Sequence, residues 1–457
     1  MRVGLLMLMA CGGQTTTDPC TEDCLSDTTA TSTGATTSTT TGTTAVPGSD
    51  LFSPAEATDL DADPGVLHVE LTASSHSFEV GERTIEGYAY NAQVPGPTLR
   101  ARVGDTIVVD FTNNLSDPTT LHWHGVHLPW EMDGVTWLQD PVNPGETVEV
   151  RFVADRAGTF WYHPHFDTEQ QMDLGLYGVF IVEDPDAPDL PDAVWVFDSW
   201  DEAPDEDEGH LHGPDDTLRE WTVNGLELPH FTADGTRRVR MLNASNKGFL
   251  SLPALRYLGN GQGLLGAEDP SRAVVLGPGE RAEVEWNLDA PNALSSEPWA
   301  AAGGPAWGDP IPLLTATEGG PLNQDWPFTG LAPTQDPGVT DVTWVLEGDG
   351  EALGWMINGE QFPYVTIPSV ALNSEAILEV RNLSAAEHPF HLHGMAFEVL
   401  SVDGLPPASK TMADTWNVRI RETVRLKIIA DNPGDWMSHC HILPHQHLGM
   451  MTVLRVE

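Results

Sequence analysis

Apolar and polar residues alternate strictly in several short segments of this chain. In residues 147–152, Val148, Val150 and Phe152 take every second position, and polar side chains take the others. Successive side chains of a β-strand point to opposite faces, so these three residues are expected on one face of a strand. Residues 424–428 repeat the pattern, and long helical periodicity is absent. The pattern predicts an all-β protein.

A turn with a central asparagine and a closing proline recurs three times along the chain. The copies are residues 88–95, 221–229 and 355–363. Their asparagines are 133 and 134 residues apart. A strand-like element also recurs in each copy, as residues 144–150, 278–284 and 421–426. This repeat predicts three tandem β-sandwich domains of a Greek-key kind. We place the domains at residues 56–188, 189–332 and 333–457.

The residues before the first predicted domain have a different character. Residues 1–10 contain Arg2 and then an apolar run too short to span a bilayer, which is typical of an export signal. The residues around Cys11 resemble a bacterial lipobox, with Cys11 as a lipid anchor; plain secretion and a misassigned start are the alternatives. Residues 11–55 are rich in Thr and Ser and predict a linker. The expected location is the periplasm or the cell surface.

The four cysteines divide by context. Cys11 is the candidate anchor, and Cys20 and Cys24 lie close enough in an exported segment to pair. Cys440 stands alone among histidines, which is where a metal-binding thiolate is expected.

The charge of the chain is strongly negative. With 68 acidic and 21 basic residues, the formal net charge is -47. This excludes nucleic acid and an anionic membrane surface as partners, so an anchor at Cys11 would be the link to a membrane. We interpret the charge as favouring solubility. A field that concentrates cationic substrates is compatible with that interpretation.

The segment around Cys440 carries the clearest chemistry. His439 and His441 flank the cysteine, and His445 and Met450 follow. Histidine, thiolate and thioether in one short stretch are typical of a blue-copper electron-transfer site, provided that a second histidine arrives from elsewhere. On a strand, residues i and i+2 share a face, so Cys440 would bind one metal ion on one side and its two neighbours would bind others on the opposite side.

Three more clusters supply histidines. They are His122 with His124, His163 with His165, and His388 with His391 and His393. The four clusters, in this order, resemble the multicopper oxidase family over nearly the whole chain after about Ser53. The resemblance implies cupredoxin domains and four copper ions. It also implies an enzyme that couples four one-electron oxidations of a substrate to the reduction of O2 to water.

The resemblance also assigns the copper ligands. The type 1 copper would take His388, Cys440, His445 and the axial Met450. The type 2 copper would take His122 and His391, and the type 3 pair His124, His163, His165, His393, His439 and His441.

The repeat indicates which domains hold copper. Pro164 of the first domain aligns with Cys440 of the third, so only the third domain keeps the type 1 site. The second domain has Leu250 and Leu252 at the corresponding place and is expected to be a copper-free spacer. The trinuclear site would then lie between the first and third domains, with ligands from both.

Two further residues concern the supply of protons for the reduction of O2. Reduction of O2 needs protons, and Asp133 matches an acidic position used in bacterial relatives. A turn aspartate before a glycine is the alternative interpretation. Many bacterial relatives carry Glu directly after the last type 1 histidine, where this chain has Gln446. Because an amide cannot donate a proton as an acid does, the relay is expected to differ or to be slower.

The predicted activity is laccase-like, with outer-sphere oxidation of phenols or aromatic amines near the edge of His445. The rival is a metallo-oxidase acting on Cu(I), Fe(II) or Mn(II). The absence of a Met-rich segment counts against a metallo-oxidase that acts on Cu(I). Glu387 and the acidic stretch with His210 and His212 could serve metal ions, so the metallo-oxidase stays an alternative. A non-enzymatic copper-buffering or structural envelope protein is a further alternative. The expected partners are O2 and a small reducing substrate, and the expected state is a monomer.

Overall fold

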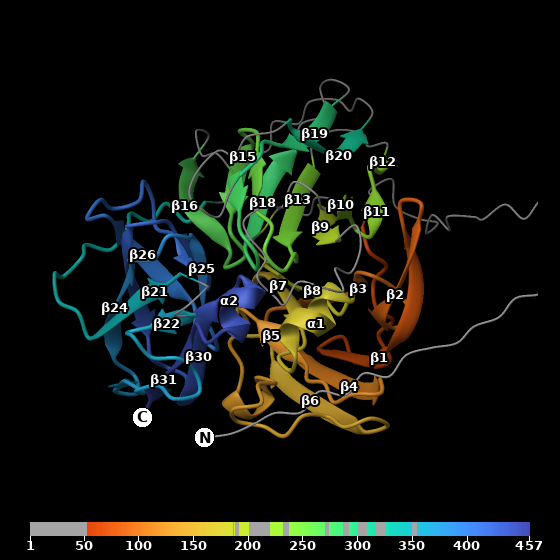
Figure 1. Cartoon of the computed structure of the whole chain (residues 1–457), viewed down its shortest axis with the longest axis horizontal. Coiled ribbons are helices and arrows are strands. Elements are labelled where there is room, and N and C mark those ends of the chain that lie inside the picture. The colour runs from red at the N-terminus through yellow and green to blue at the C-terminus, as the bar shows by residue number, and fades with distance from the viewer. Residues whose placement is uncertain are drawn as a thin grey trace, which may run out of the picture. The chain divides into compact units, whose positions relative to one another are not determined.

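The computed structural model describes residues 53–185, 187, 192–200, 220–231, 237–269, 274–286, 292–299, 309–316, 326, 328–349 and 354–457. The regular secondary structure of these residues is nearly all β-strand, as predicted (Figure 1). Among them we find no helix with the length and apolar character needed to cross a membrane. The proposed anchor at Cys11 and the pairing of Cys20 with Cys24 lie outside the described residues.

The first sandwich, coloured red to yellow in Figure 1, consists of two four-stranded sheets. One has the order β2-β1-β4-β6, with β1 (Val66–Val80), β2 (Arg83–Tyr90), β4 (Thr106–Asn114) and β6 (Thr147–Val153). The other has the order β3-β8-β7-β5, with β3 (Gly96–Arg102), β5 (His122–His124), β7 (Gly158–His163) and β8 (Gly178–Glu183). The 3-10 helix η1 (Trp130–Met132) and the helix α1 (Thr168–Asp173) lie in the connections.

The second sandwich, green in Figure 1, is built around a seven-stranded sheet of order β11-β10-β9-β13-β18-β15-β16. Its strands are β9 (Asp192–Trp200), β10 (Glu220–Val223), β11 (Leu226–Glu227), β13 (Arg237–Asn243), β15 (Arg256–Gly259), β16 (Leu264–Asp269) and β18 (Arg281–Trp286). Two smaller sheets contain β12 (His230–Phe231), β14 (Leu250–Leu252), β17 (Val274–Leu276), β19 (Asn292–Ser296) and β20 (Ile311–Ala316).

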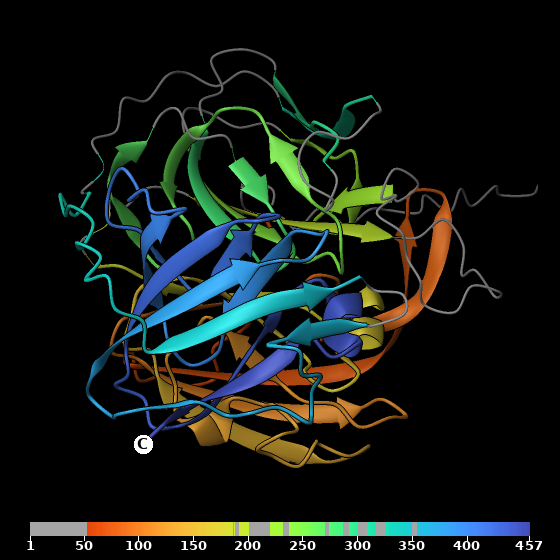
Figure 2. The same ribbon diagram turned by 60° about the vertical axis from the view of Figure 1, so that its left-hand side comes forward.

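The third sandwich is blue, and Figure 2 turns it toward the viewer. Its six-stranded sheet contains β21 (Val342–Gly348), β22 (Trp355–Ile357), β24 (Glu375–Asn382), β26 (Phe397–Val402), β27 (Met412–Ala413) and β29 (Thr423–Ile429). Its five-stranded sheet contains β23 (Ser369–Val370), β25 (His388–Leu392), β28 (Thr415–Val418), β30 (Gly434–Cys440) and β31 (Met451–Val456). The helix α2 (Leu443–His447) follows β30.

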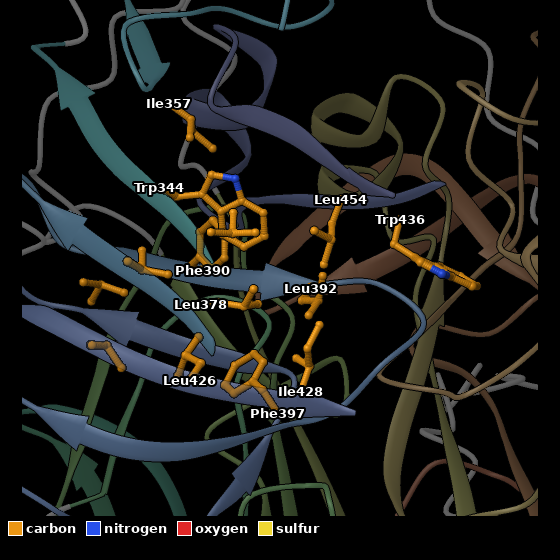
Figure 3. Close-up of a cluster of buried hydrophobic side chains, with 14 of the residues drawn as sticks. Trp344, Ile357, Leu378, Phe390, Leu392, Phe397, Leu426, Ile428, Trp436 and Leu454 are labelled. Carbon is orange, nitrogen blue, oxygen red and sulfur yellow. The ribbon is translucent and has the colours of Figure 1, made fainter. Parts of the chain in front are cut away.

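The core of the third sandwich lies between these two sheets (Figure 3). Trp344 and Leu426 come from the six-stranded sheet, and Phe390 and Leu454 come from the five-stranded sheet. The rings of Trp344 and Phe390 are in contact, with centroids 5.3 Å apart. Burial of such apolar side chains is the main favourable term in folding. The three groups of sheets fall within the three predicted segments, whose boundaries stay a prediction.

The predicted strand alternation is confirmed. Val424, Leu426 and Ile428 are buried on β29, and their neighbours are more exposed. On β6, Val150 and Phe152 are buried, whereas Val148 on the same face is 36% exposed. The periodicity therefore predicts which face of the sheet each side chain lies on. It does not predict how much of that face is buried by the partner sheet.

A separate apolar cluster joins the three sandwiches. It contains Trp161 and Tyr177 from the first sandwich, Val196 and Leu242 from the second, and Leu443 from α2. All five side chains are buried, and α1 and α2 lie side by side (Figure 1). This cluster fixes the start of α2 against the other two domains.

A buried ion-pair network also joins the first and second sandwiches. Glu283 on β18 accepts hydrogen bonds from Thr159 on β7 (2.5 Å) and from Arg238 on β13 (3.0 Å), and it pairs with Arg240 on β13 at 3.2 Å. Burial by itself raises the pKa of Glu283, but the charges of the two arginines and the hydrogen bond from Thr159 lower it to about 2.

We expect Glu283→Gln to lower the free energy of unfolding at pH 7 by about 3–5 kcal/mol, because the substitution leaves buried arginine charge uncompensated. The folded-state pKa is about 2, below the ordinary 4.5. The ionised carboxylate therefore stabilises the fold above pH ~4.5, and this stabilisation is lost as the pH falls toward 2. Unfolding temperatures of wild type and variant, measured from pH 7 to pH 2, should approach one another toward the acid end.

Glu149→Gln is the matched control for this prediction. It removes the same charge from a pair with Arg151 whose side chains are about half exposed, at 54% and 53%. Exposed pairs contribute roughly 0–1 kcal/mol. Equal unfolding temperatures of Glu283→Gln and wild type at pH 7 would show that the buried network adds no net stability.

Candidate metal centres

A thiol and two imidazoles come together in the third sandwich. Sγ of Cys440 lies 3.4 Å from Nδ1 of His388 and 3.6 Å from Nδ1 of His445. The two Nδ1 atoms are 3.1 Å apart. In the pairing of β25 with β30, Phe390 lies opposite Cys440, so His388, two residues before Phe390, shares a face with the thiol. The three groups meet the requirements of a small site for a soft metal ion.

Backbone and hydroxyl groups hold this site in place. His388 donates from Nε2 to Oγ of Ser384 at 2.6 Å, which leaves Nδ1 toward the thiol. The N–H of Ile442 donates to Sγ of Cys440 at 3.4 Å. Met450, predicted as the axial ligand, is fully buried, and its carbonyl accepts the N–H of Cys440 at 3.1 Å. The role of Ser384 was not predicted from the sequence.

His445 is the partly exposed member of this site. It lies in the short helix α2, which has Pro444 in its first turn. The indole of Trp355 packs against the His445 ring with centroids 4.0 Å apart, and against the His388 ring at 5.1 Å. Trp355 is itself 7% exposed. A buried indole therefore packs against both imidazole rings of the site.

A second centre contains eight histidines, which come from two sandwiches. β5 pairs with β7 so that His122 lies opposite His163, and β25 pairs with β30 so that His391 lies opposite His439. All eight side chains are buried. They are His122, His124, His163, His165, His391, His393, His439 and His441. The structure thus brings together every residue that was predicted for the trinuclear site.

The eight rings divide into smaller groups. The ligand atoms of His165, His393 and His439 lie within 4.8 Å of one another. The rings of His124, His163 and His441 form a triangle with centroids 5.0 to 5.8 Å apart. His122 and His391, with centroids 6.0 Å apart, are the remaining two. The groups overlap, because His391 also lies with His122 and His393 and with His124 and Asp414. The assignment of single rings to the type 2 and type 3 ions therefore stays a prediction.

The hydrogen bonds of these rings point to a metal ion. His122, His163 and His391 each donate from Nδ1 to a backbone carbonyl at 2.8 to 2.9 Å. The Nε2 atoms of the same three rings are buried and have no hydrogen-bond partner among the described residues. Buried polar atoms are nearly always paired, and a histidine that ligates a metal uses its other nitrogen to donate to a carbonyl or carboxylate. The donor set therefore fits copper ions.

Burial also keeps these histidines in the form that binds metal. It lowers the pKa to about 3 at His388 and His441, and to about 4 at His393. It lowers the pKa well below the ordinary value at His124, His163, His165, His391, His439 and His445. Neutral imidazole is the ligand form. Burial raises the pKa of the Cys440 thiol, so a bound cation would be needed to stabilise the thiolate.

Asp133 lies against the histidine cluster. Its carboxylate accepts from Nδ1 of His393 at 2.9 Å and lies 3.3 Å from Nδ1 of His122. Burial alone would raise the pKa of Asp133, but the two histidines lower it, so the group is a carboxylate at neutral pH. Gly134 has a φ of +72°, and a Cβ there would lie 2.0 Å from the carbonyl of Leu121. The turn thus packs closely against the start of β5, which places Asp133 beside the histidine rings.

A cavity of about 280 Å³ reaches the same cluster. Its lining includes Trp137, His165, Phe362, Met437, Gln446 and Met451. Nε2 of Gln446 lies 3.5 Å from Nε2 of His165. Gln446 is therefore in contact with both the cavity and a predicted type 3 ligand.

The histidines outside the two centres are in local contacts. His68 bonds to Asp110 at 2.9 Å, His127 to Asp155 at 2.7 Å, and His230 to Thr315 at 2.8 Å. His210 and His212, proposed as a further metal site, lie outside the described residues.

Cupredoxin-like sandwiches with a thiolate site and a histidine cluster define a copper-dependent oxidoreductase. Two family models, both described as multicopper oxidase, match residues 72–187 and 333–457. Together these segments cover more than half of the chain. The chain belongs to the multicopper oxidase family, whose members are copper-dependent oxidoreductases that use O2 and a reducing substrate.

Individual relatives belong to the same family, but their names give different activities. The multicopper oxidase MmcO of Mycobacterium tuberculosis is 28% identical over 450 residues, which cover 84% of this chain and 86% of the relative. Laccase-1 of Botryotinia fuckeliana is 26% identical, covering 79% of this chain and 77% of the relative. A solved multicopper oxidase from Campylobacter jejuni, described as a metallo-oxidase, has a TM-score of 0.79 and 25% identity, covering 89% and 94% of the two chains.

Proposed function

We propose that this protein is a laccase-like multicopper oxidase that oxidises phenols or aromatic amines and passes their electrons to O2. The observation that carries the proposal is the arrangement of the two centres on one strand. Cys440 belongs to the site with the partly exposed His445, and its neighbours His439 and His441 belong to the buried cluster. The backbone around Cys440 therefore gives a covalent connection only one residue long between a surface-facing site and an enclosed one.

The four copper ions of this proposal would be held as the sequence predicts. His388, Cys440, His445 and Met450 would hold the type 1 ion, His122 and His391 the type 2 ion, and the remaining six histidines the type 3 pair. When bound, the type 1 ion would supply one-electron oxidation and the other three the four-electron reduction of O2.

The remaining residues have distinct tasks around this chemistry. Asp133 orients His393 through its hydrogen bond and offers carboxylate oxygens that accept and release a proton beside the cluster. The cavity beside His165 gives small molecules a route toward the buried rings. Trp355 packs against the His445 ring and restrains its orientation, and a planar substrate can approach the partly exposed His445 itself.

A metallo-oxidase is the second candidate, supported by the description of the Campylobacter jejuni structure and by the negative net charge of the chain. Glu387 does not favour it. This side chain is buried, at 1% exposure, and its carboxylate accepts a hydrogen bond from Nδ2 of Asn417 at 2.5 Å. A carboxylate enclosed in this way is a poor docking site for a metal ion from solution.

Oxygen uptake by the copper-loaded protein tests the proposal. We expect faster uptake with dimethoxyphenol than with Cu(I), and we expect both rates to depend on Cys440, with Cys440→Ser as the blank. Faster uptake with Cu(I) would make the protein a metallo-oxidase. Readily exchangeable copper together with no Cys440-dependent uptake would favour copper buffering.

A further inference from the structure

The second sandwich carries no predicted copper ligand, yet three of its residues reach the histidine cluster. We propose that Arg281, with Gln262, is a positioning residue of the trinuclear site, so that the middle domain sets the geometry of ligands that belong to the other two domains. This inference rests on the copper assignment above and goes beyond the role of a spacer. It assigns a function to the element at residues 278–284, which recurs in the sequence repeat.

The guanidinium group of Arg281, at the start of β18, is bonded to all three sandwiches. It donates from Nη1 to Oδ1 of Asp414 at 2.7 Å, and Nη2 is paired with Oδ2 of the same carboxylate. Nε donates to the carbonyl of Thr159 in the first sandwich at 3.1 Å. Nη1 also donates to the carbonyl of Gly279 in its own turn at 3.1 Å. The side chain is 1% exposed.

Asp414 transmits this position to two of the ligands. The residue lies between β27 and β28 and is fully buried. Its carbonyl accepts from Nδ1 of His391 at 2.9 Å. Its Oδ1 atom lies 3.5 Å from Nδ1 of His124 and 3.6 Å from Nδ1 of His391. One carboxylate therefore faces a predicted type 2 ligand from the third sandwich and a predicted type 3 ligand from the first.

Gln262 holds the same carboxylate from a second direction. Its Nε2 donates to Oδ2 of Asp414 at 2.6 Å and to the carbonyl of Gly125 at 2.7 Å. Gly125 directly follows His124, and a Cβ there would lie 2.5 Å from Oδ2 of Asp414. The amide thus joins the strand end that carries His124 to the carboxylate that faces its ring.

The turn before β18 touches a third ligand. Gly279 has a φ of +76°, and a Cβ on it would lie 2.6 Å from ring carbons of His441. Only glycine permits the turn to approach the ring so closely. Arg281, Gln262 and Gly279 therefore approach the cluster from the same domain, at His124, His391 and His441.

A spacer alone would not need a buried ion pair at this place. The apolar cluster around Trp161 and Leu242 already packs the three sandwiches together. Burying a guanidinium and a carboxylate costs desolvation energy, and such a pair often adds little net stability. Partners that fix the rings of metal-ligating histidines, in contrast, typically change metal affinity by about 10- to 100-fold.

The test uses the full-length, copper-loaded protein with Arg281→Met. We expect the blue absorption of the type 1 site to be unchanged. We expect the type 2 electron paramagnetic resonance signal to change, and copper at the trinuclear site to be lost to a chelator at about 10- to 100-fold lower chelator concentration. Arg281→Lys, which keeps the charge but not the two-pronged contact, should fall between wild type and Arg281→Met.

Arg256→Met is the matched control, because it removes an arginine that pairs with Glu285 within the second sandwich. It should leave both copper signals as in wild type. If Arg281→Met does not fold, Gln262→Leu decides the question, since it removes a neutral contact to the same carboxylate and should perturb the same signal. An unchanged type 2 signal and unchanged copper retention in Arg281→Met, or in Gln262→Leu where it takes over, would overturn the inference. Failure of the wild-type protein itself to bind four copper ions would instead overturn the proposed function.

Discussion

Cys440→Ser should abolish the blue colour and reduce substrate oxidation to the background of the copper-free protein, while the fold is kept. The sulfur lies 3.4 and 3.6 Å from the two imidazole nitrogens, so it is the central donor of the site. A hydroxyl is a harder ligand than a thiolate and does not give the same intense absorption with copper. Serine is nearly isosteric with cysteine. Burying its hydroxyl costs about 1–3 kcal/mol, and the N–H of Ile442 remains nearby as a donor.

The measurement is an absorption spectrum and a copper count on the purified variant, beside a thermal unfolding curve. The count should fall from four to three copper ions per chain. Ser438→Ala, which removes a buried hydroxyl two residues earlier on the same strand, is the control and should stay blue. Blue absorbance that persists in Cys440→Ser would show that the type 1 assignment is wrong.

Asp133→Asn should slow the reoxidation of the reduced enzyme by O2 by about 100-fold, at the lower end of the range for general acid–base groups. Reduction of the enzyme by substrate should be nearly unchanged, because His445 and Cys440 do not contact this residue in the described structure. An amide cannot take up the proton that a carboxylate can. If the NH2 group of the introduced asparagine faced Nδ1 of His393, which is 2.9 Å from the carboxylate in the wild type, two hydrogen-bond donors would face each other.

Stopped-flow mixing separates the two half-reactions, with anaerobic reduction first and then mixing with O2. The matched control is Asp155→Asn. Asp155 also accepts from a histidine, His127, at 2.7 Å, but its side chain is 42% exposed and His127 is not a predicted ligand. If Asp133→Asn reoxidises at the wild-type rate, Asp133 has no role in proton transfer.

The repeating fold was predictable from local spacing, whereas the copper ligands were assigned by the resemblance of four histidine clusters to a known family. On β25, positions 388 and 390 share one face and position 391 lies on the other, so the strand period separates His388 from His391, and His393 follows the end of the strand. The same logic placed His439 and Cys440 on opposite faces of β30. These inferences need only residues that are neighbours in sequence.

The contacts of Arg281 and Trp355 were not predictable in this way. Arg281 and its partner Asp414 are separated by 133 residues and belong to different domains. Trp355 reaches His445 in α2 from β22 of the same sandwich, and in the sequence it belongs to a turn that also occurs in the other two repeats. Both contacts join residues that are distant in sequence, so the period of a single strand carries no information about them.

The distribution of the proposed ligands has a consequence for the order of assembly. Every proposed type 1 ligand lies within residues 388–450, whereas the trinuclear ligands begin at His122 and end at His441. During synthesis, the first four of these histidines leave the ribosome more than 200 residues before their partners. The strands β5 and β7, which carry three of these four histidines, therefore precede a complete binding site, and the proposed trinuclear ions would be captured only after the sandwiches have closed on one another.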